Sequence, residues 1–522
     1  MTAPEQAVTL SRISDYPRHH AQRSPDRAAL LHESGSLSYA ELAERIDQQA
    51  AALLAAGIRS GDRVATMATP RIDAIVTYLA TASIGAIWLG LNPGYTTREF
   101  GYVLGDSRPA LTTYALPAGA DDALRQLTEA LAAVGLAPPI AADDPGLRAG
   151  AAEVTPQQLQ AAREAVDTQD PALIVYTSGS TGQPKGALIR HSGLVRLGVV
   201  ESSVWHIQDL VVLCNLPVNH IGCIGDLVGV PLVAGGTLLL RDGFDAEQVL
   251  ADLQDFGISA LFQVPTMLQR IASLPGFDTA DLSRLEVVGW GGSPLPVATM
   301  RRYRERGCAL VSTYGLTEAT CSVTYTDADS TEEVLLNTVG RPDPGMNVRL
   351  LGEDGDWVAD GERGEVCVRN ETSMVGYWNR PEATAAAYTP DGWLRTGDIG
   401  YVRPDGNLVL VGRAHEMFKS GGYNVYPREV EQVIESHPGV ALAAVVPVPH
   451  AEYHEVGMAF VQPRPDAELD LDDLRRYCRE RLAGYKVPKA FEVMAHLPLL
   501  PVGKVDKTQL REQATDERGS QS

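Results

Sequence analysis

The apolar positions of the chain follow two alternating spacings. In residues 38–57 they recur every three to four positions, which predicts a helix that ends at Gly57. The run Arg63–Ala68 predicts a buried strand, and a second helix through Ala82 follows it. Because this alternation of strand and helix continues to about residue 310, we expect layers of helices and sheets, an α/β fold.

The pattern changes in the second half of the chain. Residues 117–169 are rich in alanine and acidic side chains, and they predict one or two peripheral helices. A short apolar strand at Ala172–Tyr176 leads into a loop of glycine, serine and threonine. From about 339 to 411 short strands are separated by Asp-Gly turns, which predicts a small β-region. A separate α+β unit follows, up to about residue 512.

Composition excludes several classes of protein. The 522 residues correspond to three or four folding units. The 66 acidic and 44 basic side chains give a net charge of −22, which argues against a nucleic-acid partner. The longest apolar run, Leu227–Leu240, is too short to span a bilayer and contains Pro231, so we expect no integral membrane contact. The first residues lack the basic and apolar regions of a secretion signal, and the six cysteines are scattered, so we expect a cytoplasmic protein with reduced thiols.

Lysine is rare in this chain, with six among the 44 basic residues. Five of them lie beyond residue 412, and Lys185 lies in the glycine-rich loop. Since arginine serves as the usual surface cation here, a lysine indicates a need for a compact, mobile charge.

The glycine-rich loop reads Y-T-S-G-S-T-G-Q-P-K-G from Tyr176 to Gly186. Its hydroxyl groups and backbone N–H groups can surround an oligophosphate, and Lys185 can add a positive charge. The Walker pattern is absent, because Pro184 precedes the lysine and Gly186 follows it. A Ser/Gly surface turn is the alternative interpretation. The candidate phosphate-binding residues of the loop are Thr177, Ser178, Gly179, Ser180, Thr181, Gly182 and Lys185.

Further motifs follow the loop in a fixed order. Together with the loop they resemble the adenylate-forming (AMP-binding) enzyme superfamily, most closely the acyl-CoA and aryl-CoA synthetases. The motifs are P-V-N-H at 217–220, W-G-G-S-P-L at 290–295, T-Y-G-L-T-E-A at 313–319, L-R-T-G-D-I at 394–399, the segment 412–427, and V-G-K-V-D-K at 502–507.

This resemblance implies a nucleotide site. Tyr314 would stack on adenine, Asp398 would accept hydrogen bonds from the ribose hydroxyls, and Glu318 would hold Mg²⁺ through a hard oxygen ligand. Without the family, Tyr314 would be interpreted as a core aromatic residue and Glu318 as a solvated charge. The implied ATP/AMP-binding residues beyond the loop are Gly291, Gly292, Ser293, Pro294, Thr313, Tyr314, Gly315, Thr317, Asp398, Arg413 and Lys504.

The resemblance also implies residues for catalysis and for the second half-reaction. The expected catalytic residues are Lys504, His220, Thr317 and Glu318. The ammonium group of Lys504 would bridge a carboxylate and a phosphate and stabilise the charge of the transition state. His415 is the expected hinge, where Asp or Lys is usual. The expected CoA-binding residues are Lys419, Gly421 and Gly422, and the expected acyl pocket comprises His220, Gly222, Gly225, Trp290 and Gly291.

The implied organisation is an N-terminal domain over 1–411, a hinge at 412–416, a mobile C-terminal domain over 417–512 and a polar tail at 513–522. The expected function is an AMP-forming acid–CoA ligase that uses ATP, Mg²⁺ and CoA, with a homodimer left open. Glycines at 222, 225 and 229 favour a medium-chain or ring-bearing acid, with close helix packing as the alternative.

Two other functions stay open. The first is an adenylation enzyme that passes the acyl group to a carrier protein or an amine, and the second is a non-catalytic acyl or nucleotide binder. Activation of an amino acid is disfavoured, because Asn219, His220 and Ile221 stand where an acidic residue would hold the ammonium group, with Asp226 the nearest acid.

Overall fold

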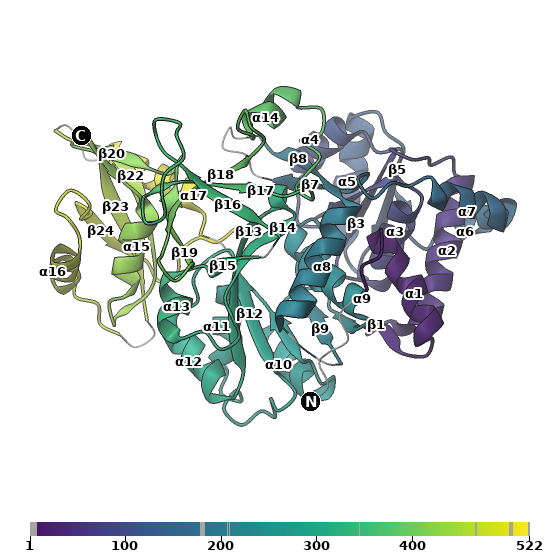
Figure 1. Ribbon diagram of the computed structural model, residues 1–522, viewed down its shortest axis with the longest axis horizontal. Coiled ribbons are helices and arrows are strands. Elements are labelled where there is room, and N and C mark those ends of the chain that lie inside the picture. Colours follow the sequence, from purple (N-terminus) through teal and green to yellow (C-terminus); the bar gives the residue numbers. More distant parts are fainter. Residues whose placement is uncertain are drawn as a thin grey trace.

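The computed structural model describes residues 8–177, 183–205, 207, 209–343, 345–450, 452–464, 467–500 and 505–519. A large N-terminal domain contains two mostly parallel sheets and a small antiparallel sheet, and a small α+β domain follows it (Figure 1). The predicted α/β fold is therefore confirmed. The helices that the structure describes include none that is both long and apolar enough to cross a membrane.

The first sheet has six strands in the order β6-β5-β3-β4-β7-β8, parallel except for the last pair. Helices cover both faces, because Val64 and Trp88 pack towards α2 and α3 while Met67 and Leu89 pack towards α4 and α5. The strands are β3 (Arg63–Ala68), β4 (Ile87–Leu91), β5 (Leu111–Ala115), β6 (Ile140–Ala141), β7 (Pro171–Thr177) and β8 (Lys185–Arg190). The helices are α1 (Tyr16–Arg23), α2 (Tyr39–Ala55), α3 (Ile72–Ser83), α4 (Thr97–Ser107), α5 (Asp121–Ala133), α6 (Pro145–Gly150) and α7 (Pro156–Glu164).

Local sequence signals explain these elements. The Ser38 side chain and Glu41 form a capping box at the start of α2, and Gly57 just after its end has a φ of +89°. The predicted strand Arg63–Ala68 is confirmed as β3. Residues 117–169 form more than the one or two helices predicted, since they contain α5, α6, α7 and the edge strand β6.

The second sheet has nine strands in the order β15-β14-β13-β12-β11-β9-β10-β1-β2. Its strands are β1 (Ala28–His32), β2 (Gly35–Ser38), β9 (Val211–Cys214), β10 (Thr237–Leu240), β11 (Ala260–Phe262), β12 (Val287–Gly291), β13 (Ala309–Leu316), β14 (Cys321–Tyr325) and β15 (Arg341–Pro342). The helices beside it are α8 (His191–Trp205), the π-helix η3 (Gly222–Gly229), α9 (Val230–Ala234), α10 (Ala246–Asp255), α11 (Pro265–Ala272), α12 (Val297–Glu305) and α13 (Glu332–Asn337).

The predicted β-region is an antiparallel sheet of four strands, accompanied by α14 (Pro381–Ala386). Its strands are β16 (Asn347–Leu351), β17 (Gly364–Arg369), β18 (Leu394–Val402) and β19 (Leu408–Arg413). A turn at residues 414–416 leads into the C-terminal domain, which lies at the opposite end of the molecule from α1 and α2 (Figure 1).

The C-terminal domain has a five-stranded sheet with two helices on one face and one helix on the other. Its strands are β20 (Phe418–Ser420), β21 (Tyr423–Val425), β22 (Val440–His450), β23 (His454–Pro463) and β24 (Ala490–Val493), and its helices are α15 (Pro427–Glu435), α16 (Leu471–Arg481) and α17 (Lys507–Gly519). The polar tail was predicted to begin at residue 513. The structure has a helix there instead, because α17 continues to Gly519 and buries Ala514 against β22 and β23.

Polar contacts join the C-terminal domain to the small β-region. Asn424 Nδ2 donates to Glu353 Oε1 at 3.1 Å, and Arg363 lies 3.7 Å from Glu429. In each pair at least one side chain is exposed to solvent.

Candidate active site

Three segments that are distant in the sequence meet beside the glycine-rich loop. Thr177, at the end of β7, donates from Oγ1 to Glu318 Oε1 at 3.2 Å, and the Tyr377 hydroxyl donates to the same oxygen at 2.8 Å. Lys185 Nζ lies 5.3 Å from the centre of the Tyr377 ring, a cation–π contact. The structure thus brings together the predicted Thr177, Lys185 and Glu318, while the loop residues 178–182 lie outside the described residues.

Tyr377 belongs to this group, although its sequence context gave no sign of it. Residues 375–378 run beside β8: Trp378 N–H donates to the Gly186 carbonyl at 2.7 Å and Val375 N–H to the Leu188 carbonyl at 2.8 Å. Burial, together with the charge of Glu318, raises the pKa of Tyr377, so that its hydroxyl remains a donor at neutral pH.

Replacing Tyr377 with phenylalanine should lower the rate of ATP-dependent adenylation by about 3- to 10-fold, because Glu318 loses a donor that fixes its carboxylate. The melting temperature should change little, since the ring and its contact with Lys185 remain. Pyrophosphate release at saturating ATP measures the effect, with Tyr388→Phe as a control at another half-buried tyrosine of the same region. Equal loss in both variants would contradict the role.

A second group lies around Asp398 of β18. Asp398 is buried; its Oδ2 accepts from the Tyr314 hydroxyl at 2.7 Å, and its Oδ1 lies 3.0 Å from Arg413 Nε. Arg413 reaches it from the opposite position on β19, where the two residues are paired in register. Burial and the charge of Asp398 raise the pKa of Tyr314. The structure therefore places the predicted Tyr314, Asp398 and Arg413 in one polar cluster.

The strand ends beside Tyr314 need small residues. A Cβ on Gly315 would stand 1.7 Å from the Cys321 carbonyl oxygen, and Gly292 has a φ of +82°. Gly292, Ser293 and Pro294 form an exposed loop, Gly291 is half-buried, and Thr317 is buried. Thr313, predicted to bind the nucleotide, has its hydroxyl 2.8 Å from Ser322 Oγ and 3.0 Å from the Thr324 carbonyl. This hydroxyl is therefore bonded to β14 within the sheet.

Trp290 does not line an acyl pocket, which corrects the prediction from sequence. Its side chain is 3% exposed and packs in the apolar core with Leu268 and Tyr303. The reason is the alternation of β12, on which Trp290 lies between two glycines and points to the opposite face. On the glycine face, a Cβ at Gly289 would collide with the Phe262 ring.

Two of the predicted acyl-pocket glycines, Gly222 and Gly225, lie on the π-helix η3. Gly225 is buried, and a Cβ there would stand 2.9 Å from Leu197 Cδ2 of α8, so this glycine allows close helix packing and does not open a pocket. Gly222 is half-buried beside His220, whose Nδ1 accepts from Gly222 N–H at 3.1 Å. His220 is also half-buried, and in the neutral ring this bond leaves the proton on Nε2.

The predicted residues of the C-terminal domain lie on its surface. Lys419 is exposed on β20, and Gly421 and Gly422, with φ values of +59° and +86°, form the exposed turn to β21. His415 is exposed in the turn after β19. Lys504 lies outside the described residues, which resume at Val505.

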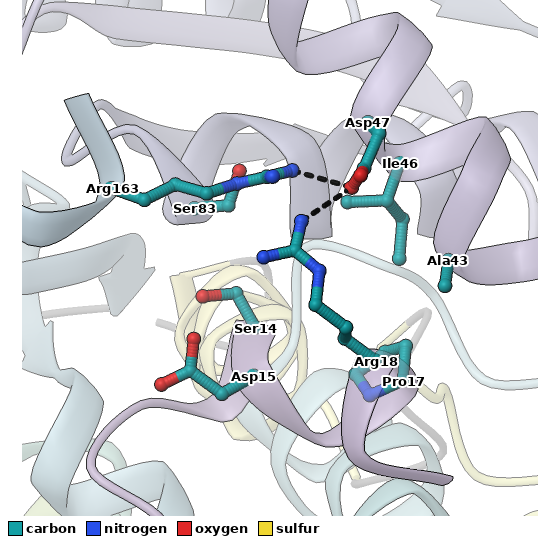
Figure 2. A pocket seen from close by; sticks show the side chains of 9 residues that line it. All are labelled: Ser14, Asp15, Pro17, Arg18, Ala43, Ile46, Asp47, Ser83 and Arg163. Atoms are coloured by element: carbon teal, nitrogen blue, oxygen red, sulfur yellow. Dashed lines mark hydrogen bonds and ion pairs between the residues drawn. The ribbon is translucent and has the colours of Figure 1, made fainter. Parts of the chain in front are cut away.

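A separate cavity between α1, α2 and α7 is structural (Figure 2). Arg18 and Arg163 both donate to Asp47 Oδ1, at 2.7 and 2.6 Å. The cavity of about 10 Å³ has room for a single water molecule, so it is an ion-pair cluster that holds the helices together rather than a ligand site.

Comparison with known proteins decides the family. The model of the AMP-binding enzyme family matches residues 17–378, and that of the AMP-binding enzyme C-terminal domain matches residues 429–504. The chain belongs to the AMP-binding enzyme family. It is thus an adenylate-forming enzyme in fold and domain order, and the resemblance drawn from its motifs is confirmed.

Relatives within this family cover almost the whole chain. The feruloyl-CoA synthase of Amycolatopsis sp is 37% identical over 502 residues, which are 96% of this chain and 98% of that protein. ATP-bound MatB from Rhodopseudomonas palustris has a TM-score of 0.86 at 30% identity, over 97% and 99% of the two chains. The amide bond synthetase McbA from Marinactinospora thermotolerans has a TM-score of 0.84 at 29% identity, over 96% and 99%.

Proposed function

We propose that this AMP-binding enzyme is an acid–CoA ligase. It converts a carboxylic acid and ATP to an acyl-adenylate and pyrophosphate, and CoA then displaces AMP to give the thioester. The observation that carries the proposal is that residues from separate motifs of an adenylate-forming enzyme lie together in two groups. One group contains Thr177, Lys185 and Glu318, and the other contains Tyr314 and Asp398. Near full-length similarity to a CoA synthase supports it.

The first group would receive the triphosphate of ATP. Thr177 and Lys185 flank the glycine-rich loop and supply a hydroxyl and a positive charge. Glu318 fits a Mg²⁺ ion, because its Oε2 has no hydrogen-bond partner among the described residues while Thr177 and Tyr377 orient Oε1. The ion, when bound, would screen the charge of the phosphates.

The second group would receive the nucleoside. Both oxygens of Asp398 have one partner each, which leaves lone pairs for the ribose hydroxyls. The exposed backbone at 291–294 would face the adenine with Tyr314. Lys504 would join the reacting carboxylate and the α-phosphate during adenylation, assisted by Thr317 and with His220 bordering the acyl group.

The second half-reaction would use the C-terminal domain in another orientation. We propose that the segment 412–416, with His415, is the hinge between an N-terminal domain ending at 411 and the C-terminal domain. Gly421 and Gly422, without side chains at a surface turn, would let the thin pantetheine chain of CoA pass, with Lys419 beside it. All six cysteines are free thiols, which fits a cytoplasmic enzyme.

We propose a ring-bearing acid as the substrate, ahead of a medium-chain fatty acid. The support is that a relative named for the feruloyl group is 37% identical to this protein over 96% of the chain. A panel of carboxylates, with pyrophosphate release and CoA thioester measured together, tests the function and the class. Ring-bearing acids should have the highest kcat/KM, and acetate or palmitate in first place would contradict the class.

The second candidate function is acyl transfer to an amine or a carrier protein, which the similarity to an amide bond synthetase favours. Two results together would replace our proposal by this one. Pyrophosphate would be released without formation of a CoA thioester, and an acylated product would form after addition of an amine or a carrier protein. The absence of pyrophosphate release with every acid of the panel would point instead to the non-catalytic binder.

A further inference from the structure

Two carboxyl groups are buried together between α8 and η3. Glu201 of α8 is fully buried, and neither of its oxygens has a hydrogen-bond partner among the described residues. Oδ1 of Asp226, on η3, is also buried without a partner. A buried acceptor without a donor typically costs about 1–3 kcal/mol, so such a pair calls for a reason beyond stability.

Neutral groups surround this pair. The Cys321 thiol donates to Asp226 Oδ2 at 2.9 Å, and Ser322 and Tyr325 of β14 lie beside Glu201. Buried acids elsewhere in this domain differ, because Arg241 binds Asp252 with two nitrogens and Arg196 binds Asp343. The pair is therefore not a structural salt bridge that the fold needs.

The pair adjoins the expected acyl site. The point where a Cβ on Gly222 would stand lies 3.1 Å from His220 Nδ1 and 3.5 Å from Asp226 Oδ2. Gly222, His220 and Asp226 are each half-buried, so this side of the pair is not sealed from solvent. Asn219 Oδ1, one residue before His220, is a further buried acceptor without a partner. A π-helix produces this arrangement, and such turns recur at functional sites.

We infer that Glu201 and Asp226 form a specificity site that accepts a hydrogen bond from a hydroxyl group on the acyl part of the substrate. The inference rests on the proposed function, because it names the kind of acid that the enzyme activates. A hydroxyl supplies the donor that these buried acceptors lack, whereas a methyl ether or a hydrogen in its place would leave them unpaired.

A neutral donor fits better than a cation. Burial raises the pKa of Glu201 well above its ordinary range, and burial also raises that of Asp226 to about 7. At neutral pH at least one of the two carboxyls is therefore protonated, which weakens their attraction for an ammonium group but leaves acceptor oxygens for a hydroxyl.

The test compares 3-phenylpropanoic acid with its ring-hydroxylated, ring-methoxylated and ring-aminated forms at each ring position, using pyrophosphate release by the full-length enzyme. For one position, kcat/KM of the hydroxy acid should exceed that of the methoxy acid by about 10-fold or more. Asp226→Leu and Glu201→Met, which remove the acceptors at similar volume, should reduce this ratio to about 3-fold or less. Asp226→Asn, which keeps one acceptor oxygen, should give an intermediate ratio.

The control variant is Asp343→Asn, which alters a buried carboxylate already bound by Arg196 and should leave the ratio unchanged. Three results would overturn the inference. The hydroxy and methoxy acids could react equally in the wild type, or the ring-aminated acid could be preferred. The ratio of kcat/KM between hydroxy and methoxy acids could also stay unchanged in Asp226→Leu and Glu201→Met. Glu201→Gln should melt at or above the wild-type temperature, since an unpaired carboxyl is removed, and a large fall would overturn the inference by showing a structural role.

The readouts separate this inference from the proposed function. If no CoA thioester forms but pyrophosphate is released, the ligase proposal fails and the ratio of hydroxy to methoxy acids still decides the inference. If no pyrophosphate is released, the same ratio is measured as binding affinity in the presence of AMP by calorimetry. Equal affinities would overturn the inference in that case as well.

Discussion

Lys504→Ala is expected to lower the rate of acyl-adenylate formation by about a thousandfold while sparing thioester formation from a supplied acyl-adenylate. Adenylation brings a carboxylate to a phosphate, and the lysine would stabilise the negative charge that develops between them. The second half-reaction starts after that charge has left with pyrophosphate. The two steps should therefore respond differently to the loss of a single ammonium group.

Two assays measure the two halves separately. Pyrophosphate release reports adenylation, and a synthetic acyl-AMP with CoA reports thioester formation. Lys489→Ala is the matched control, because Lys489 is an exposed lysine of the same domain, 5.7 Å from the Tyr453 ring centre. Equal losses in both halves for Lys504→Ala would show that the lysine supports the domain instead of the chemistry.

Asp398→Ala is expected to raise the KM for ATP by about 100-fold, because a carboxylate that binds two ribose hydroxyls makes charge-assisted hydrogen bonds of about 1.5–3 kcal/mol each. The structure adds a second effect. Tyr314 and Arg413 both lose their partner, so the melting temperature without ligand should fall by a few degrees.

The variant Tyr314→Phe separates these two effects. It removes the hydroxyl that binds Asp398 but leaves the carboxylate and an aromatic ring in place, so ATP binding should weaken much less than in Asp398→Ala. Titration of ATP followed by calorimetry and thermal melting gives both quantities. A collapse of the melting temperature in Asp398→Ala, with unchanged ATP affinity in the folded fraction, would assign Asp398 to the fold alone.

Local sequence signals were sufficient for much of the fold. The strand Arg63–Ala68 and the helix that stops before Gly57 follow from apolar spacing and from the glycine, and both are confirmed. The motifs also named Thr177 and Glu318 as parts of one site, and the structure brings the two side chains into contact.

The errors have identifiable physical causes. Trp290 was assigned to the acyl pocket without the two-residue alternation of its strand, which directs it into the core. Gly222 and Gly225 were both assigned to the acyl pocket, whereas Gly225 of the π-helix η3 allows close packing against Leu197, the alternative considered from the sequence. Tyr377 was missed because its position depends on pairing with β8 nearly 190 residues earlier, which no local pattern encodes.

The polar contacts between the small β-region and the C-terminal domain bear on the proposed rotation of that domain. Exposed polar pairs such as Asn424 with Glu353 and Arg363 with Glu429 typically contribute about 1 kcal/mol or less, and salt weakens the charged one. These polar pairs would therefore offer little resistance to the proposed rotation. Substrates and products would then select the orientation of the domain, and ionic strength would tune how readily it turns.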